Sequence, residues 1–375
     1  MDRDGVAGHD GGRRPERARR GPGGPGGPGE APGGGGGGGV IGTVTSVVGR
    51  ARELLEPALR GTVARLGPEL GPIVAYHLGF VEADGSPRGS ASGKALRPAL
   101  AFLGAEAVGA PAEVALPGAL AVELTHNFSL LHDDVMDRDR VRRHRPTAWA
   151  LFGVGNAITA GDALLAEAQR ILVEEPSPQG VRAARALARA TARMIEGQAQ
   201  DLSFESRLDV SMAECRRMAA NKTGALLSCA ASIGAILAGA PAEAVRALGA
   251  FGRHLGVAFQ AVDDLLGIWG RPEVTGKPVA SDLRQRKKTF PIVAALRSPH
   301  PAAARLRALL ADGPTEGELE EAARLVEEAG GRRWTEAEAD RELRLAVGAL
   351  EGVRLAPGPR GELVELARFV GRREA

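Results

Sequence analysis

With 375 residues, 44% of them hydrophobic, the chain is long enough for one large domain or two ordinary ones with a sizeable core. Its 48 basic and 46 acidic residues nearly cancel, and no isolated block of like charge suggests a nucleic-acid surface. The composition therefore predicts a globular protein without a nucleic-acid partner, in which any electrostatic chemistry is local.

The cysteines and the start of the chain give the expected compartment. Cys215 and Cys229 have neither metal-ligand spacing nor the density of a disulfide scaffold, so we expect buried, reduced thiols. The N-terminus has no apolar core like that of a signal peptide. The longer apolar stretches are interrupted before they reach the roughly eighteen residues that span a bilayer. We expect a cytoplasmic protein without a membrane span.

The first forty-odd residues differ from the rest. Between positions 21 and 40, seventeen of the twenty residues are Gly or Pro, which cannot bury enough surface to offset the entropy of ordering. We therefore expect a disordered tail over residues 1–43, either passive or a docking segment, and one folded domain over residues 44–375.

The folded part has the pattern of an all-α protein. It is rich in Ala, Leu, Arg and Glu, with apolar residues at spacings of three and four and few alternating runs. Gly and Pro separate the segments. Helices are predicted near 46–60, 94–108, 113–136, 157–173, 180–205, 211–238, 242–269 and 282–297, with shorter ones to the C-terminus.

A first acidic cluster lies in the segment LHDDVMDRDRVRRHR, which contains four aspartates and five arginines. Spacings of three and four place His126, Ser129, Asp133 and Asp137 on one face of an otherwise apolar helix. With Asp134, three carboxylates gather at the C-terminal end of that helix, where the helix dipole disfavours negative charge. A cation must compensate them.

Two kinds of cation could do so. The arginines that follow, such as Arg138, Arg140, Arg142 and Arg143, could simply pair with the acids. Carboxylates one turn apart also hold Mg²⁺, which takes a few carboxylate oxygens together with water and substrate phosphates. An acidic string of this kind alone is weak evidence, because it occurs on many solvated helix ends.

A second acidic cluster strengthens the case for metal. In FQAVDDLLGIWG, the residues Gln260, Asp263, Asp264 and Gly267 share a face of another apolar helix. Two carboxylate pairs on apolar helices are costly to bury without a cation. Facing each other, they would clamp Mg²⁺ ions that bridge a diphosphate.

Basic residues complete the predicted site. Each one alone is usually a solvated charge. Together with the acids they predict a site for more than one diphosphate, one held through metal and another held directly. The set is Lys94, Arg97, Arg142, Arg143, Lys222 with its neighbour Thr223, and Lys277.

These motifs resemble those of the trans-isoprenyl diphosphate synthases, the polyprenyl synthetase family, over roughly residues 50–370. In family order they are GKALRP, ELTHNFSLLHDDVMDRDRVRRHRPT, GQAQDL, NKTGALL, FQAVDDLLG and GKPVASDLRQRKKTFP. The resemblance implies the all-α isoprenoid synthase fold, with antiparallel helices around a central cavity and the two aspartate-rich helices on opposite walls. It also implies a homodimer.

The resemblance implies roles for individual residues as well. The implied ligands of three Mg²⁺ ions are Asp133, Asp134, Asp137 and Asp263, with Asp264 beside them. The implied contacts of the allylic diphosphate are Arg142, Lys222, Thr223, Gln260 and Lys277. The implied pocket for isopentenyl diphosphate consists of Gly93, Lys94, Arg97, His126 and Arg143.

The implied reaction is a head-to-tail condensation. Mg²⁺ and the cations stabilise the departing diphosphate, an allylic carbocation forms in a dry cavity, and the double bond of isopentenyl diphosphate attacks it. A proton is then lost to the departed diphosphate. The catalytic residues would be Asp133, Asp134, Asp137, Arg142, Lys222 and Asp263.

Two positions depart from the family pattern. The second cluster has Gly267 where the family usually has a third aspartate, and we expect activity to survive there with altered metal affinity. The first motif has Ala95 in place of a basic residue, but Lys94 and Arg97 remain.

Product length should depend on the side chains below the first cluster. Phe128 precedes Asp133 by five residues, about 7.5 Å along the helix, where an aromatic ring would obstruct a lengthening chain. Ser129 is small and leaves room. In the family, this pattern fits a product near C20. We expect geranylgeranyl diphosphate, with farnesyl or geranyl diphosphate as the alternative.

Other interpretations stay open at this point. A class I terpene cyclase also uses an aspartate-rich helix and Mg²⁺, but it binds one diphosphate and would not need the second basic set. A non-catalytic partner subunit would be expected to lack aspartates of the first cluster, which are all present here. Some relatives with long N-terminal extensions are cargo of encapsulin shells, so residues 1–43 are a candidate shell-targeting segment.

Overall fold

The computed structural model describes residues 37–88, 95–271 and 279–372, and the side chains from position 44 onward together with Gly42. The chain divides into two units, Met1–Gly36 and Gly37–Ala375. The first unit and the expected targeting function of the tail lie outside the described residues. All that follows concerns the second unit.

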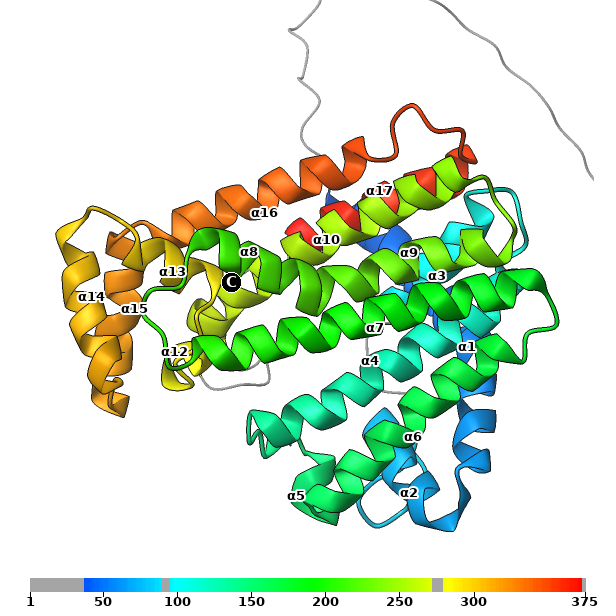
Figure 1. Ribbon diagram of the computed structural model, residues 1–375, viewed down its shortest axis with the longest axis horizontal. Helices are drawn as coiled ribbons and strands as arrows, with labels where there is room; N and C mark the ends of the chain where they lie inside the picture. Colours follow the sequence, from blue (N-terminus) through cyan, green and yellow to red (C-terminus); the bar gives the residue numbers. More distant parts are fainter. Residues whose placement is uncertain (1–36, 89–94, 272–278, 373–375) are drawn as a thin grey trace, which may run out of the picture. The chain divides into compact units, whose positions relative to one another are not determined.

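The second unit is built from helices (Figure 1). The α-helices are α1 Gly37–Arg65, α2 Gly67–Leu78, α3 Leu96–Glu106, α4 Leu116–Met136, α5 Ala148–Phe152, α6 Val154–Val173, α7 Pro178–Phe204, α8 Met212–Ala219, α9 Ala225–Leu237, α10 Ala242–Trp269, α12 Ser281–Arg284, α13 Phe290–Leu296, α14 Pro301–Asp312, α15 Leu319–Glu328, α16 Gly331–Gly348 and α17 Pro357–Gly371. Short 3₁₀ turns are η1 Ala112–Ala115 and η3 Glu316–Glu318, and η2 Ala220–Gly224 is a π-helical turn. A two-stranded antiparallel hairpin joins β1 Val141–Arg142 to β2 Arg145–Pro146.

The all-α prediction is confirmed, and most predicted helices are found within a few residues of their expected bounds. The helix predicted over 211–238 is found as a continuous helical stretch from Met212 to Leu237, because α8 continues through η2 into α9. The prediction of one helix over 282–297 is wrong: α12 and α13 are separated by a five-residue connection that ends at Thr289 in an extended conformation. Pro291, which has no backbone N–H, is tolerated there because it lies in the first turn of α13.

Helix α2 and the hairpin were not predicted. The sequence of α2 contains Pro68 and Pro72, which suggest breaks, yet Pro68 occupies the first turn, where a missing N–H costs little. The helix ends at Gly79, whose φ of 80° suits the left-handed cap. The two prolines in this segment therefore explain why the sequence did not predict the helix.

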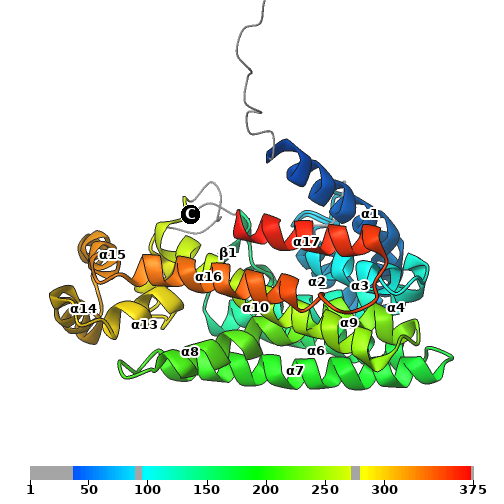
Figure 2. The ribbon, with the colours of Figure 1, turned by 90° about the horizontal axis from the view of Figure 1, so that it is seen from above.

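The long helices pack side by side into one core. Helix α9 contacts α3, α7 and α10, and α4 contacts α6. Viewed from above, α17 and α16 cover one side of α10, while α9 and α7 lie on its other side (Figure 2). Cys229 is buried in this core and Cys215 in a second apolar cluster around α8, α10 and α13, both as free thiols, as expected.

One described helical stretch, Ala112–Met136, is long and apolar enough to cross a membrane by length and composition alone. Its most apolar window has a mean hydropathy of 1.2, and 61% of that window is buried inside the protein. Helices in the core of a globular domain satisfy the same criterion, so this stretch is weak evidence for a membrane span.

Candidate active site

A single cavity of about 740 Å³ collects the predicted chemistry from several helices. Asp133 and Asp137 reach it from α4, and Asp263 reaches it from α10. The two acidic clusters, which lie 130 residues apart in the chain, therefore line one space. Burial, opposed by Lys222 and Arg142 and aided by the nearby carboxylates of Asp137 and Asp134, raises the pKa of Asp133 to about 6.

Two lysines form ion pairs with carboxylates that line the cavity near Asp133. Nζ of Lys222 lies 2.6 Å from Oδ2 of Asp201 on α7. Nζ of Lys287, which follows α12, lies 2.8 Å from Oδ1 of Asp137 and 3.2 Å from the same oxygen of Asp201. Burial alone would lower the pKa of Lys287, but Asp201 and Asp137 raise it above the ordinary value. Gly197 allows this arrangement, because a Cβ there would collide with the backbone of Lys222.

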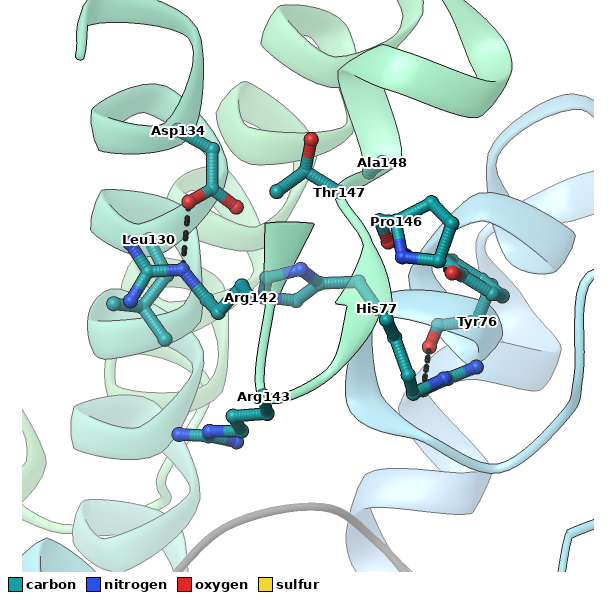
Figure 3. A pocket seen from close by; sticks show the side chains of 10 residues that line it. Tyr76, His77, Leu130, Asp134, Arg142, Arg143, Pro146, Thr147 and Ala148 are labelled. Atoms are coloured by element: carbon teal, nitrogen blue, oxygen red, sulfur yellow. Dashed lines mark hydrogen bonds and ion pairs between the residues drawn. The ribbon is translucent and has the colours of Figure 1, made fainter. Parts of the chain in front are cut away.

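Asp134 faces away from the large cavity. Its Oδ1 accepts a hydrogen bond of 2.6 Å from Nε of Arg142, and its side chain is buried (Figure 3). It lines a separate pocket of about 40 Å³. The prediction that Asp134 shares metal with Asp133 needs this correction, because adjacent residues of a helix point about 100° apart. In this structure Asp134 positions Arg142 instead.

The hairpin carries the two adjacent arginines. Its turn consists of Arg143 and His144, with φ of 51° and 62°, left-handed values that suit the two-residue turns of hairpins but cost energy without glycine. Figure 3 shows Arg142 pointing toward α4, with His77 of α2 beside it. Burial, Arg142 and Arg143 lower the pKa of His77 to about 3, so its imidazole is neutral. Its Nε2 has no hydrogen-bond partner among the residues that the structure describes.

The start of α3 and the middle of α4 bring together the second basic set. Arg97, Arg143 and His126 all line the large cavity. Burial, Arg97 and Arg143 lower the pKa of His126 well below its ordinary value, so this imidazole is neutral and has one N–H that can donate to a ligand. Within the described part of the chain the buried Nε of Arg97 has no hydrogen-bond partner, as expected where a ligand oxygen would bind. Glu123 also lines the cavity, and its negative charge acts on Arg97 and Arg143.

Asp264 is held by the protein on both oxygens. Oδ1 accepts from Nε2 of Gln260 at 2.7 Å, and Oδ2 accepts from the backbone N of Phe290 at 2.9 Å. Thr223 donates to Oε1 of Gln260 at 2.5 Å, which links η2 to α10. Burial and the charge of Asp282 raise the pKa of Asp264 well above its ordinary value. Both Asp263 and Asp264 line the large cavity, and the two hydrogen bonds to Asp264 hold its carboxylate in place at the wall.

Phe128 does not occupy the predicted floor. It packs edge-to-face against His132, with ring centroids 4.8 Å apart, and is absent from the residues that line the cavity. Ser129 does line the cavity. Helix geometry explains the difference: four residues before Asp133 is nearly the same face, whereas five residues turn the side chain about 140° away.

Three predicted residues, Gly93, Lys94 and Lys277, lie outside the described residues. Three others at the site had no assigned role at the sequence level. Asp201, Asp282 and Lys287 all line the cavity. They belong to the quoted motifs GQAQDL and SDLRQRKK, so the signal was present, but nothing in its spacing ties them to the two acidic helices.

The donor set fits Mg²⁺ in the way that diphosphate enzymes use it. Within the described residues, no three His, Cys, Asp or Glu side chains form a metal cage. Mg²⁺ needs no such cage, because it is commonly held by one or two carboxylates plus substrate phosphates. Asp133 and Asp137 on one wall and Asp263 on the other supply those carboxylates.

Comparison with known proteins identifies the family. Residues 88–326 match the model of the polyprenyl synthetase family. A (2E,6E)-farnesyl diphosphate synthase of Mycobacterium tuberculosis is 50% identical over 88% of this chain and 93% of its own length. A geranylgeranyl diphosphate synthase of the same organism is 43% identical over 88% and 94%.

Solved structures show the same fold. A polyprenyl synthetase from Streptomyces coelicolor superposes with a TM-score of 0.83 at 50% identity, covering 87% of this chain and 99% of that one. A geranylgeranyl pyrophosphate synthase from Corynebacterium glutamicum, complexed with isoprenyl diphosphate and magnesium, gives 0.74 at 26%, covering 88% and 99%. The chain belongs to the polyprenyl synthetase family. It is a prenyltransferase, a trans-prenyl diphosphate synthase.

Proposed function

We propose that the protein condenses isopentenyl diphosphate with an allylic diphosphate, head to tail and with Mg²⁺, to a short-chain all-trans prenyl diphosphate. The observation that carries this is the meeting of Asp133, Asp137 and Asp263 in one cavity that also holds two separate basic sets. A terpene cyclase would have no use for the second basic set. The complete first cluster argues against a non-catalytic subunit.

The acidic and the basic residues of the site have different roles. Asp133, Asp137 and Asp263 would hold Mg²⁺, which neutralises charge on the diphosphate as the allylic C–O bond breaks. Arg142 and Lys222 bind the same departing group. Each is anchored by a buried carboxylate, so it stays oriented without a substrate.

The second basic set would bind isopentenyl diphosphate. Arg97 and Arg143 supply charge, and neutral His126 supplies a hydrogen bond. The double bond of this substrate attacks the allylic cation, a new C–C bond forms, and the proton lost from the adjacent carbon passes to the departed diphosphate. Apolar lining such as Leu226 and Phe259 excludes water that would otherwise capture the cation.

The experiment is turnover by the purified protein alone. Asp133→Asn should lower kcat/KM roughly 10²- to 10³-fold, because it removes charge that acts on the leaving group. Asp340→Asn, an exposed position on α16, is the matched control and should not change turnover. Absence of any product from the wild-type protein with both substrates and Mg²⁺ would end the proposal.

We propose geranylgeranyl diphosphate as the main product, because Ser129 rather than an aromatic side chain lines the cavity one turn from Asp133. Farnesyl diphosphate is the second candidate, favoured by the 50% identity to a farnesyl diphosphate synthase. Product analysis after incubation with C5, C10 and C15 allylic primers distinguishes them. Accumulation of C15 product with excess isopentenyl diphosphate would favour the second candidate.

We also propose a homodimer. Helices α6 and α7, which contact each other, expose four large apolar side chains: Ile158, Val173, Val181 and Ile195. Exposed apolar surface, where it is contiguous, commonly marks an interface. Ultracentrifugation should show a dimer that Ile195→Asp weakens, and a monomeric wild type would refute it.

Targeting of an encapsulin shell by residues 1–43 and a cytoplasmic location remain predictions. Co-expression of the full-length and the tail-deleted protein with a shell protein tests the first. Encapsulation of only the full-length protein is the expected result, and equal encapsulation of both would refute it.

A further inference from the structure

The hairpin that carries Arg142 and Arg143 is fastened to the end of helix α2 by an arginine that follows its turn. Nη1 of Arg145 donates to the carbonyl of Tyr76 at 3.2 Å, and Nη2 donates to the carbonyl of Val81 at 2.9 Å. The last carbonyls of a helix lack partners within it, and a cation at that end also suits the helix dipole. A guanidinium group, which has several donors in one plane, can therefore join this helix end to the hairpin.

Tyr76 completes the contact from the side of the helix. Its hydroxyl donates to the carbonyl of Pro146 at 2.7 Å, and Figure 3 shows the two residues side by side. The guanidinium carbon of Arg145 lies 4.2 Å from the centre of the Tyr76 ring, which is a cation–π distance. The Tyr76 side chain is buried, so these contacts are shielded from water. We call Tyr76 and Arg145 the clamp.

The two adjacent arginines of the hairpin are held in different ways. Nε of Arg142 donates to the buried carboxylate of Asp134 at 2.6 Å, so α4 orients this side chain directly. Over the described ranges 37–88, 95–271 and 279–372, the side chain of Arg143 makes no hydrogen bond and no ion pair, although it lines the large cavity. The position of Arg143 thus depends on the backbone that carries it.

That backbone is strained at the turn. Arg143 and His144 have φ of 51° and 62°, which are left-handed values without glycine. Such conformations persist at ligand sites only where the surrounding structure enforces them. Arg145 and Pro146 follow the turn directly, and both take part in the contact with α2. The clamp is therefore placed to hold the turn, and with it Arg143, in this conformation.

We infer that Tyr76 and Arg145 are positioning residues for isopentenyl diphosphate: they hold the turn so that Arg143 faces this substrate. The inference rests on the proposed function, which assigns Arg143 to isopentenyl diphosphate. Neither residue of the clamp lines the large cavity, so its effect passes through Arg143. Because Arg142 has its own anchor in Asp134, the clamp acts on one of the two diphosphates and spares the other.

The test is calorimetric titration with isopentenyl diphosphate, without Mg²⁺ and without an allylic substrate. Arg145→Met removes both hydrogen bonds of the guanidinium group. It should weaken binding roughly tenfold, because the charged contact of Arg143 with the substrate loses its geometry. Tyr76→Phe keeps the ring and removes one neutral hydrogen bond, so it should weaken binding roughly threefold.

Glu82→Gln is the matched control. Glu82 lies 3.5 Å from Nη2 of Arg145, and its side chain is 47% exposed. An ion pair with so exposed a partner contributes little, and the substitution leaves the two carbonyl contacts of Arg145 in place. Glu82→Gln should therefore bind isopentenyl diphosphate as the wild type does.

Initial rates with both substrates varied separate positioning from a merely structural role. Positioning predicts that Arg145→Met raises KM for isopentenyl diphosphate roughly tenfold, while KM for the allylic diphosphate and kcat stay within about threefold of the wild type. A merely structural clamp would lower the Tm and the folded fraction of the enzyme. That would reduce the apparent kcat and leave both KM values unchanged.

The outcomes separate this inference from the function on which it rests. Wild-type affinity in Arg145→Met, or an equal rise of KM for both substrates, would overturn the positioning role and leave the proposed function standing. If Arg145→Met does not fold, Tyr76→Phe decides in the same way, and unchanged affinity there overturns the role. A wild-type protein that binds no isopentenyl diphosphate would overturn the proposed function as well.

Discussion

We expect substitution of Lys287 to lower the thermal stability by an amount that depends strongly on bound metal. Its ammonium group lies among three carboxylates: Asp137 at 2.8 Å, Asp201 at 3.2 Å and Glu205 at 3.3 Å. In Lys287→Met the volume is nearly kept but the charge is lost. Removing one partner of a buried ion pair costs about 3 to 5 kcal/mol. The lower figure applies here, because Asp201 keeps its contact with Lys222 and Glu205 is well exposed.

The assay is thermal unfolding with and without Mg²⁺ and inorganic diphosphate. Without metal, a loss of about 3 kcal/mol should lower the Tm by about 5 °C in a domain of this size. With both ligands present the difference should shrink, because bound Mg²⁺ would then neutralise Asp137 in place of the lysine. Metal binding by Lys287→Met should accordingly be tighter than in the wild type.

Lys288 provides the matched control, since it is the neighbouring buried lysine. Its Nζ donates to backbone carbonyls of Glu205 and Arg286, at 3.0 and 2.6 Å. Lys288→Met should lower the Tm by an amount that Mg²⁺ does not change. The reasoning is refuted if Lys287→Met melts like the wild type without metal, or if its deficit is the same with and without Mg²⁺.

Three further predictions concern product length, substrate binding and pH. Ser129→Phe should shorten the product, whereas Phe128→Ala should leave the product distribution unchanged, because of these two residues only Ser129 lines the cavity. Chromatography of the dephosphorylated alcohols measures the product lengths, and a change caused by Phe128→Ala would contradict this placement of the side chain. Arg143→Gln should raise KM for isopentenyl diphosphate roughly tenfold or more, whereas Arg142→Gln should chiefly lower kcat. Initial rates measured with each substrate varied test this, and equal effects of the two substitutions on KM and kcat would contradict it. Burial raises the pKa of Glu338, but its hydrogen bonds to Arg216 and Arg341 outweigh this effect and lower the pKa to about 2. The stability that ionised Glu338 contributes above pH 4.5 should therefore be lost in the wild type between about pH 4.5 and 2. Unfolding titrations of Glu338→Gln should lack that part of the acid dependence, and acid profiles identical to those of the wild type would contradict the prediction.

Much of the active site could be predicted from local sequence. Helix periodicity is a property of the chain itself, so the spacing of Asp133 and Asp137 already placed both carboxylates on one face of an apolar helix. The same holds for Gln260 and Asp263. Acid on the buried faces of apolar helices requires a cation, and this requirement indicates metal and diphosphate.

Other features depended on packing between distant segments. Which of two adjacent aspartates faces the cavity is decided by how α4 is rotated against its neighbours, and this rotation turns Asp134 toward the arginine of the hairpin. The same rotation directs Phe128 toward His132. Periodicity gives the relative angle of two side chains on one helix, but it does not say which angle points to the cavity.

The sequence by itself determined the fold class, the two acidic helices and the chemistry that their charges demand, because these follow from the spacing of neighbouring residues. Only the tertiary structure decided that Asp201 and Lys287 complete the first wall and that Asp282 takes the space beside Gly267. The physical reason is that contacts between α7, α10 and α12 join residues that are far apart in the chain, and their distances are set by the packing of whole helices rather than by any local repeat.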